Sequence, residues 1–369
     1  MKMIVAVLIL AGAVTASAQL DPKWQLVWSD EFAGPSIDLT KWTYEIGAGG
    51  WGNQELQYYT ARPENSSIQN GALVIEARKE KFSTSSYTSA RMKTQGLHTW
   101  TFGRMEARIA LPGGKGIWPA FWMLGGNFPT VGWPNCGEID ILEHVETTDM
   151  PLFTVRGSLH GPNFSGANSI HGDVRVSSGL TNVFHTYAIE WSPTEVKFFF
   201  DNNNYYTGTP SAMPSGGTWV FDHPFFFIMN IAVGGGWPGS PDATTPFPAR
   251  MLVDYVRVYS DSTLHPGNNL KATIAMAPAS NGPNWQAMAT ITVKDPAGNP
   301  VSGVNVQGQW SGITTVGATQ KVTDSNGVAV LSSGRTKSSG TIQLCLTDLD
   351  KAGYVYVPQA ETDCASITK

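Results

Sequence analysis

The sequence has few charged residues and no excess of positive charge. Lys, Arg, Asp and Glu together make up 14% of the 369 residues, and the net charge is −5. A chain without a basic excess lacks the electrostatic footprint of a nucleic-acid-binding or membrane-surface protein. Aromatic residues, at 11%, argue against disorder. We therefore expect a folded monomer with a neutral partner, and neither nucleic acid nor a membrane among its partners.

Long apolar runs are also missing, apart from one at the N-terminus. Met3 to Val14 is apolar, follows Lys2 and precedes the small residues Ala16-Ser17-Ala18, which is the pattern of a cleavable secretory signal. The run is shorter than the ~20 residues of a membrane-spanning helix. We expect residues 1–18 to be a signal peptide and the mature protein, beginning at Gln19, to be secreted and extracellular.

Cysteine is scarce, with three residues in the chain. Cys345 and Cys364 lie near the C-terminus, and an oxidising compartment would allow them to pair. Cys136 stands apart from them, and we expect it to be a buried and inert thiol. Whether the C-terminal pair forms a disulfide is left open by the sequence.

Helical periodicity is missing as well, whereas alternation of polar and apolar residues is common. The strands predicted in this way are Trp24–Trp28, Leu73–Ala77, Arg104–Ile109, Thr186–Trp191, Val196–Phe200 and Met251–Tyr259. Alternation of this kind is typical of antiparallel sheets with one covered face. We therefore expect an all-β fold in which residues 19–262 form one domain, a sandwich of two packed sheets.

The composition changes after a turn-rich linker at residues 263–270. Beyond it, the segments Asp295–Pro300 and Asp324–Gly327 have the residues of hairpin turns between β-branched runs. Short strands at regular spacing over about 100 residues are typical of an immunoglobulin-like sandwich. We expect such a module at residues 271–369. The sequence leaves open whether it is a spacer, a stabiliser or a carbohydrate binder.

The segment Glu138–Glu143 places three carboxylates within six residues. Strand alternation puts Glu138 and Asp140 on one face, with isoleucines on the other. It would also turn Glu143 into the core, where an unpaired carboxylate is costly. One extra residue, a β-bulge at Ile141-Leu142, would return that glutamate to the acidic face. Aligned acids suit bond cleavage between two carboxylates; a surface strand or a structural cation site is the simpler alternative.

Three tryptophans precede the acidic strand: Trp118, Trp122 and Trp133. Trp118 and Trp122 share one face of a strand. An indole stacks on the apolar face of a sugar ring, and its N–H can bond a hydroxyl. These residues therefore predict a carbohydrate cleft. The alternative is that the aromatic residues fill the core, and it weighs more for Phe121 and Met123.

The segment Glu138-Ile139-Asp140-Ile141-Leu142-Glu143 resembles the signature of glycoside hydrolase family 16, in the bulged form of its laminarinase-like members. The resemblance covers most of residues 24–259. The further matching segments are Trp28–Phe32, Trp51–Tyr59, Trp118–Leu124 and Val253–Tyr259. It implies a β-jelly-roll sandwich with a substrate cleft. It also implies endo-acting, retaining hydrolysis of a β-1,3-glucan such as laminarin, with no cofactor for catalysis.

The same resemblance implies a role for each acid. Glu138 would be the nucleophile, Glu143 the general acid and base with a raised pKa, and Asp140 the group that keeps the nucleophile ionised. Besides the three tryptophans, the sugar contacts implied are Asn53, His144, His160, Asn230 and Trp237. A structural Ca²⁺ would bind Glu31, the carbonyl of Gly71 and Asp254; ordinary surface acids are the alternative.

Two other functions remain open. One is a hydrolase or transglycosylase of the same family acting on mixed-linkage glucan, agarose or carrageenan. The other is a glucan-binding protein without catalysis, against which the presence of both Glu138 and Glu143 argues.

Overall fold

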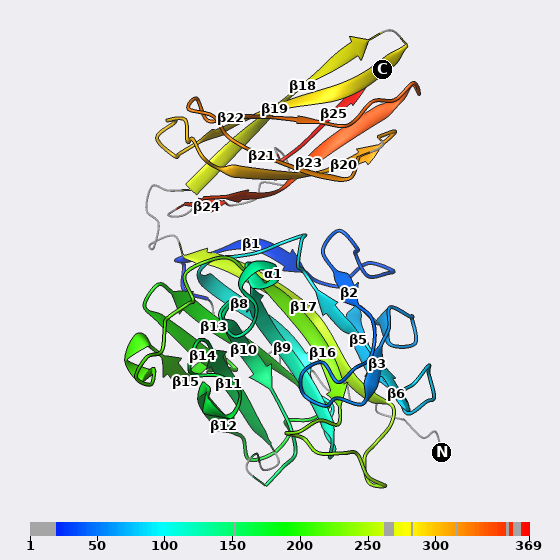
Figure 1. Ribbon diagram of the computed structural model, residues 1–369, viewed down its shortest axis with the longest axis vertical. Coiled ribbons are helices and arrows are strands. Elements are labelled where there is room, and N and C mark those ends of the chain that lie inside the picture. The colour runs from blue at the N-terminus through cyan, green and yellow to red at the C-terminus, as the bar shows by residue number, and fades with distance from the viewer. Residues whose placement is uncertain are drawn as a thin grey trace, which may run out of the picture.

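The computed structural model describes residues 20–148, 150, 153–261, 269–281, 283–314, 316–351, 354–356 and 363–369. The predicted signal peptide and most of the predicted linker lie outside the described residues. Figure 1 shows two β-sandwiches that follow one another along the chain, a larger one and a smaller one. Nowhere in the described residues does a helix combine the length and the apolar composition needed to cross a bilayer.

The first sheet of the large sandwich contains all six strands predicted from the sequence. Its strands are β1 (Trp24–Asp30), β4 (Ser66–Gln69), β5 (Ala72–Ala77), β8 (Gly103–Ala110), β13 (Phe184–Ser192), β14 (Glu195–Phe200), β15 (Asn203–Gly208) and β17 (Ala249–Asp261). Their order is β15-β14-β13-β8-β17-β5-β4, and β1 pairs with β17. Every pairing is antiparallel, as alternation predicted.

The second sheet carries the acidic strand between two neighbours, β9 and β11. Its strands are β2 (Thr43–Glu45), β7 (Arg91–Lys93), β9 (Ile117–Gly125), β10 (Glu138–Glu143), β11 (Thr154–His160), β12 (Ile170–Arg175) and β16 (Phe225–Val233). Their order is β12-β11-β10-β9-β16-β7-β2. Two further strands, β3 (Gln57–Tyr59) and β6 (Tyr87–Ser89), pair in parallel. The helical turns are α1 (Phe128–Val131), η1 (Gly166–Asn168) and η2 (Pro210–Ala212).

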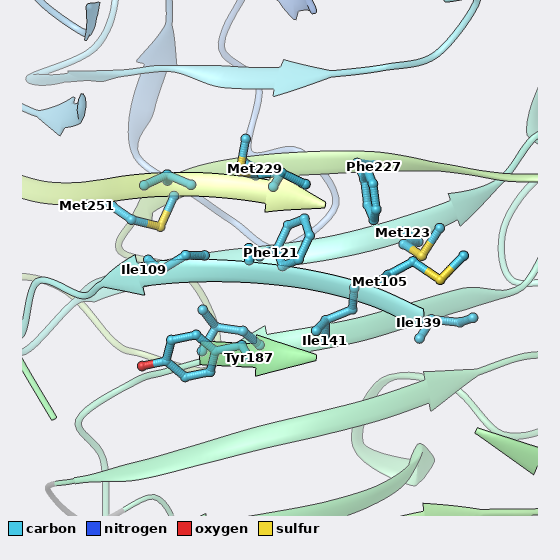
Figure 2. Packing of buried hydrophobic residues seen from close by; sticks show 14 of the residues in the cluster. Met105, Ile109, Phe121, Met123, Ile139, Ile141, Tyr187, Phe227, Met229 and Met251 are labelled. Atoms are coloured by element: carbon cyan, nitrogen blue, oxygen red, sulfur yellow. The ribbon is translucent and has the colours of Figure 1, made fainter. Parts of the chain in front are cut away.

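The inner faces of the two sheets enclose one hydrophobic core (Figure 2). Its members include Met105, Ile109, Phe121, Met123, Ile139, Ile141, Tyr187, Phe227, Met229 and Met251, none of which is more than 1% exposed. Phe121 and Met123 therefore fill the core, which was the alternative to a role in the cleft. The jelly-roll architecture expected for this domain agrees with these two packed sheets.

The acidic strand contains the predicted bulge. Asp140 pairs with Trp122 and Leu142 pairs with Phe121, so Ile141 has no partner on β9. Ile141 and Leu142 both lie in the core, at 1% and 0% exposure. Two consecutive inward residues shift the alternation by one position. The last glutamate of the strand therefore returns to the face that carries the first.

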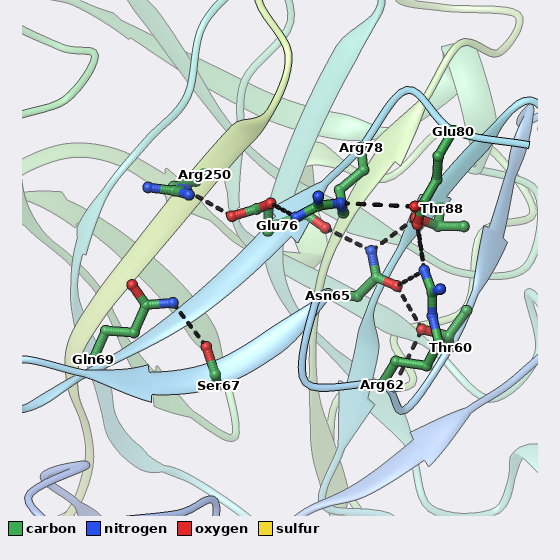
Figure 3. Close-up of polar contacts among 10 residues, drawn as sticks. All are labelled: Thr60, Arg62, Asn65, Ser67, Gln69, Glu76, Arg78, Glu80, Thr88 and Arg250. Atoms are coloured by element: carbon green, nitrogen blue, oxygen red, sulfur yellow. Dashed lines mark hydrogen bonds and ion pairs between the residues drawn. The ribbon is translucent and has the colours of Figure 1, made fainter.

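A buried polar cluster joins β3 to β6 (Figure 3). The Asn65 side chain accepts a hydrogen bond from Thr60 Oγ1 at 2.6 Å and donates to Thr88 Oγ1 at 2.9 Å and to the carbonyl oxygen of Glu76 at 3.0 Å. The Thr60 backbone N–H donates to the carbonyl of Ser89 at 2.9 Å. These bonds fix the end of β3, the strand that follows the loop at residues 50–56.

The small sandwich consists of two four-stranded sheets with their own core. Its strands are β18 (Asn269–Asn281), β19 (Asn284–Lys294), β20 (Asn305–Gly312), β21 (Ala318–Val322), β22 (Val328–Ser332), β23 (Thr341–Asp350), β24 (Val355–Tyr356) and β25 (Cys364–Thr368). Cys345 and Cys364 form a disulfide between β23 and β25. Trp285 and Trp310 are each only 2% exposed, so neither is available to stack on a sugar.

Candidate active site

The three acids of β10 face one cleft on the outer side of the second sheet. This cleft has a volume of about 350 Å³. It is lined by Trp51, Gly52, Asn53, Glu55, Arg91, Trp118, Ala120, Trp122, Leu124, Phe128, Trp133, Glu138, Asp140, Glu143, Asn230 and Ala232. The sheet thus brings together segments that are more than 170 positions apart in the sequence, such as those of Asn53 and Asn230.

Glu143 is nearly buried and sits among hydrogen-bond donors. Trp118 Nε1 donates to Glu143 Oε1 at 3.1 Å, and Ser158 Oγ donates to Glu143 Oε2 at 3.5 Å. Burial, together with the neighbouring charge of Asp140, raises the pKa of Glu143 to about 8. A carboxyl that keeps its proton at neutral pH can act as a general acid, so the predicted direction of the pKa shift is confirmed.

Glu138 and Asp140 share this environment but differ in their contact with water. The Glu138 side chain is 17% exposed, whereas that of Asp140 is 5% exposed. Burial raises the pKa of Glu138 to about 8 and raises the pKa of Asp140 well above its ordinary value. The three acids therefore share protons rather than ionising together. Since the Asp140 side chain is the more buried of this pair, burial favours the proton on Asp140 more strongly than on Glu138.

His160 faces the first two acids with a protonated ring nitrogen. The backbone N–H of Gly166 donates to His160 Nδ1 at 3.0 Å, so the proton of a neutral ring is on Nε2. His160 Nε2 lies 2.9 Å from Asp140 Oδ2 and 3.7 Å from Glu138 Oε1. The structure therefore places His160 against the acids, where its partial positive charge favours ionisation of Glu138.

Glu138, Asp140 and His160 are also the only group of metal-ligating side chains close enough to hold an ion within the described ranges. A metal would need the lone pair of His160 Nε2. The ring proton would then move to Nδ1, which already faces the N–H of Gly166. The N–H of His160 Nδ1 would then face the N–H of Gly166, and two donors cannot form a hydrogen bond. This arrangement therefore does not suit a metal, and no metal step enters the chemistry below.

Most of the residues predicted as sugar contacts lie in the lining of the cleft. Trp118, Trp122, Trp133, Asn53 and Asn230 all line the cleft. Trp133 is 46% exposed, which leaves its ring free to stack. Trp122 Nε1 donates to Asn230 Oδ1 at 2.9 Å, which fixes the indole on the cleft floor. The predicted Trp237 does not line this part of the cleft, but its ring contacts that of Trp118 at 5.4 Å.

His144 was predicted as a sugar contact, and the structure corrects this. Its side chain is 1% exposed, and its Nδ1 lies 2.8 Å from the carbonyl oxygen of Thr154. Its Nε2 lies 3.9 Å from Glu146 Oε1. Because His144 follows Glu143 directly, alternation turns it away from the cleft. The role it has here is to hold the chain after β10.

Among the cleft residues that were not predicted as sites, four have charged or aromatic side chains: Trp51, Glu55, Arg91 and Phe128. Trp51 and Glu55 lie in the segment Trp51–Tyr59, one of those that carry the family resemblance, and that segment was the available signal. The guanidinium of Arg91 lies 5.1 Å from the ring centre of Trp51 and 4.8 Å from that of Trp122. It links two walls by cation–π contacts. Nothing local in the sequence marks Arg91 or Phe128.

The residues predicted to hold calcium are already engaged with arginines. Both oxygens of Glu31 accept hydrogen bonds from Arg257, at 2.9 and 2.7 Å. Asp254 Oδ2 accepts a hydrogen bond from Arg108 at 2.7 Å. A cation between them would have to displace two positive partners. As placed, Glu31 and Asp254 therefore do not fit the oxygen-only set that calcium needs, and Gly71 would be left as a lone carbonyl ligand.

The raised pKa of Glu143 predicts how stability depends on pH. An unfolded glutamate titrates near pH ~4.3, whereas the folded one titrates at about 8. Between these values the folded state binds more protons, so stability falls as pH rises. We expect Glu143→Gln to raise the melting temperature by about 2–4 °C at pH 8.5, which corresponds to ~1 kcal/mol. At pH 4.5 the difference should vanish.

Thermal unfolding of both proteins across this pH range measures the effect. Glu64→Gln, at an exposed position, is the control and should show no such pH-dependent gain. An equal gain for Glu143→Gln at both pH values would contradict the assigned environment of Glu143.

Comparison with known proteins agrees with this geometry. A family model described as glycosyl hydrolases family 16 matches residues 53–257. A beta-glucanase from Rhodothermus marinus is 46% identical over 252 residues, which cover 64% of this chain and 86% of that protein.

The laminarinase catalytic domain from Thermotoga maritima superposes with a TM-score of 0.61 at 50% identity, covering 64% of this chain and 98% of the other. The endo-beta-1,3-glucanase from Pyrococcus furiosus superposes with a TM-score of 0.61 at 49% identity, covering 64% and 94%. The chain therefore belongs to glycosyl hydrolase family 16.

Proposed function

We propose that this chain is a secreted, monomeric endo-hydrolase that cleaves β-1,3-glucan of the laminarin type with retention of anomeric configuration. The observation that carries this proposal is the bulge of β10, which puts Glu143 on the same face as Glu138 and Asp140. Two positioned carboxyl groups on a cleft floor are what glycoside hydrolysis requires. The relatives named above as a beta-glucanase and laminarinases support the choice of a β-1,3-glucan.

Glu138 and Glu143 carry the two steps, with Glu143 acting first as an acid and then as a base. In the first step, a carboxylate oxygen of Glu138 bonds to the anomeric carbon, the glycosidic C–O bond breaks, and Glu143 gives its proton to the leaving oxygen. In the second, Glu143 takes a proton from water, the water oxygen bonds to the anomeric carbon, and Glu138 leaves. Because burial raises the pKa of Asp140, this residue keeps its proton and can share it with Glu138.

The charges of the cleft favour a neutral polysaccharide. Its lining contains four carboxyl groups, and Arg91 is the cationic side chain among them. Arg91 is itself paired with Glu45. A sulfated galactan would need a basic cleft, because its sulfates would otherwise meet these carboxylates. The exposed indole of Trp133 and the indoles of Trp118 and Trp122 instead offer stacking surfaces to uncharged sugar rings.

A substrate panel tests the proposal directly. We expect release of reducing sugar from laminarin as a series of oligosaccharides, weaker activity on lichenan, and none on agarose or carrageenan. Product analysis by chromatography separates endo from exo cleavage. Laminarin left intact while another polysaccharide is degraded would assign the enzyme to that substrate. Binding of laminarin without any cleavage would favour the non-catalytic alternative.

Substitution of the nucleophile tests the assigned chemistry. Glu138→Gln keeps the shape of the side chain but removes the attacking charge, so we expect kcat to fall roughly 10³-fold or more with little change in affinity for laminarin. Steady-state kinetics and a laminarin titration followed by tryptophan fluorescence measure the two effects. The exposed Glu64→Gln is the matched control. Appreciable turnover by Glu138→Gln would exclude Glu138 as nucleophile.

Calcium is not part of the proposed mechanism. Since Glu31 and Asp254 are held by arginines, we expect a chelator to leave the melting temperature of the protein unchanged within about 1 °C. Thermal melts in EDTA and in added calcium make the comparison. Stabilisation that saturates with calcium would mean that the two carboxylates release Arg257 and Arg108 and form the site that the family resemblance implies.

A further inference from the structure

Glu55 is a buried carboxylate at the edge of the cleft, and the catalytic scheme does not use it. It is 7% exposed and lines the same cleft as the catalytic acids. Three side chains donate hydrogen bonds to it. Asn53 Nδ2 donates to Glu55 Oε1 at 3.2 Å. Gln57 Nε2 and Tyr59 Oη donate to Glu55 Oε2 at 2.6 and 3.1 Å.

The direction of two of these bonds is fixed from outside. The backbone N–H of Val233 donates to Gln57 Oε1 at 2.7 Å, so the Gln57 amide nitrogen must face Glu55. The same reasoning applies to Tyr59. The indole N–H of Trp122 can only donate, and it does so to Asn230 Oδ1 at 2.9 Å.

That bond turns the amide nitrogen of Asn230 toward Tyr59, to whose hydroxyl oxygen it donates at 3.1 Å. The Tyr59 proton is then left for Glu55 Oε2. The hydrogen bonds therefore run one way, from the cleft floor at Trp122 to Glu55. Because two donors that cannot reverse meet at Oε2, this oxygen has to be an acceptor.

Asn53 differs from these partners, because the orientation of its amide depends on Glu55 alone among the described side chains. Its side chain is exposed in the cleft and is free to turn over. With an ionised Glu55, the Asn53 nitrogen faces the carboxylate and the oxygen faces the cleft. A hydrogen-bond donor at the Oε1 position would reverse this, because the Asn53 oxygen would then turn inward and its NH₂ group outward.

We propose that Glu55 is a positioning residue that makes Asn53 present its oxygen, and not its nitrogen, to a sugar hydroxyl of the bound glucan. This inference rests on the proposed function, since it names a contact to the same substrate. Glu55 itself stays behind Asn53 and Tyr59 and does not touch the reacting atoms. The cluster around Asn65 supports this arrangement by fixing the end of β3, on which Gln57 and Tyr59 lie (Figure 3).

Glu55→Gln is the variant that isolates this effect. Its new amide oxygen can accept from Gln57 and Tyr59, and its new NH₂ group can donate to Asn53, so every buried partner stays satisfied. The hydrogen bonds that run from Trp122 through Asn230 and Tyr59 to residue 55 are kept, but the side-chain amide of Asn53 turns over. In the full chain we expect KM for laminarin to rise about tenfold, which is ~1.4 kcal/mol, while kcat stays within about twofold and the melting temperature stays constant.

A rescue variant distinguishes positioning from general structural damage. In Asn53→Asp combined with Glu55→Gln, the carboxylate and the amide exchange places, and an oxygen again faces the cleft. We expect KM to return to within about threefold of the wild type. In an Asn53→Ala background, Glu55→Gln should have no further effect, because the group it turns is gone. The remote Glu195→Gln is the control for loss of a carboxylate.

The outcomes separate this inference from the proposed function. If the wild type cleaves laminarin but Glu55→Gln leaves KM unchanged, the role of Glu55 is wrong while the function stands. A rise in KM that the exchange variant does not rescue, or that persists in Asn53→Ala, also overturns it. If the wild type prefers another glucan, the same series on that glucan still decides the role of Glu55. If no turnover is found, laminarin titration followed by tryptophan fluorescence decides it.

Discussion

The site depends on keeping one carboxylate out of a hydrophobic core. Glu143 ends a strand whose neighbours Ile141 and Leu142 are packed between two sheets. Without the extra residue, alternation would bury this glutamate among apolar side chains, where an unpaired charge is strongly unfavourable. The bulge keeps Glu143 out of the core and also places all three acids on one face of the sheet. Core packing and active-site geometry are thus set by a single irregularity of the sheet.

Burial of these acids has a chemical consequence. Three carboxyl groups in one partly dry cleft hold more protons than they would in water, because each charge lacks solvation and meets its neighbours. Different neighbouring side chains contact each of the acids. His160 places its Nε2 within 4 Å of carboxylate oxygens of Asp140 and Glu138, while Trp118 donates to Glu143. An acid that keeps its proton and a neighbour that loses it are what double displacement requires.

The part of the cleft between its floor at Trp122 and its edge at Glu55 is organised by hydrogen-bond direction rather than by charge alone. Trp122, Asn230 and Tyr59 form a series of donors that ends at Glu55. Such a series has no freedom to reverse, because the indole at its start can only donate. The cleft therefore offers substrate a defined pattern of donors and acceptors before any substrate binds, which lowers the entropy lost on binding.

Much of this could be predicted from the sequence, because its signals are local. Strand alternation identified six of the eight strands of the first sheet, and the spacing of Glu138, Asp140 and Glu143 required the bulge that the structure contains. The tryptophans before the acidic strand were placed correctly in the cleft. Burial of Phe121 beside the exposed face of Trp122 follows from the same period of two.

The remaining features were decided by the tertiary structure, because they depend on which segments meet. The carboxylate of Glu31 lies beside Arg257, which is 226 positions away, and this contact competes with the calcium site that the family resemblance implied. His144 is near the acids in sequence but faces away from the cleft, where Thr154 holds it. Arg91 enters the cleft because β7 pairs with β16. A local pattern determines the face of a strand, whereas pairing between distant strands determines what that face meets.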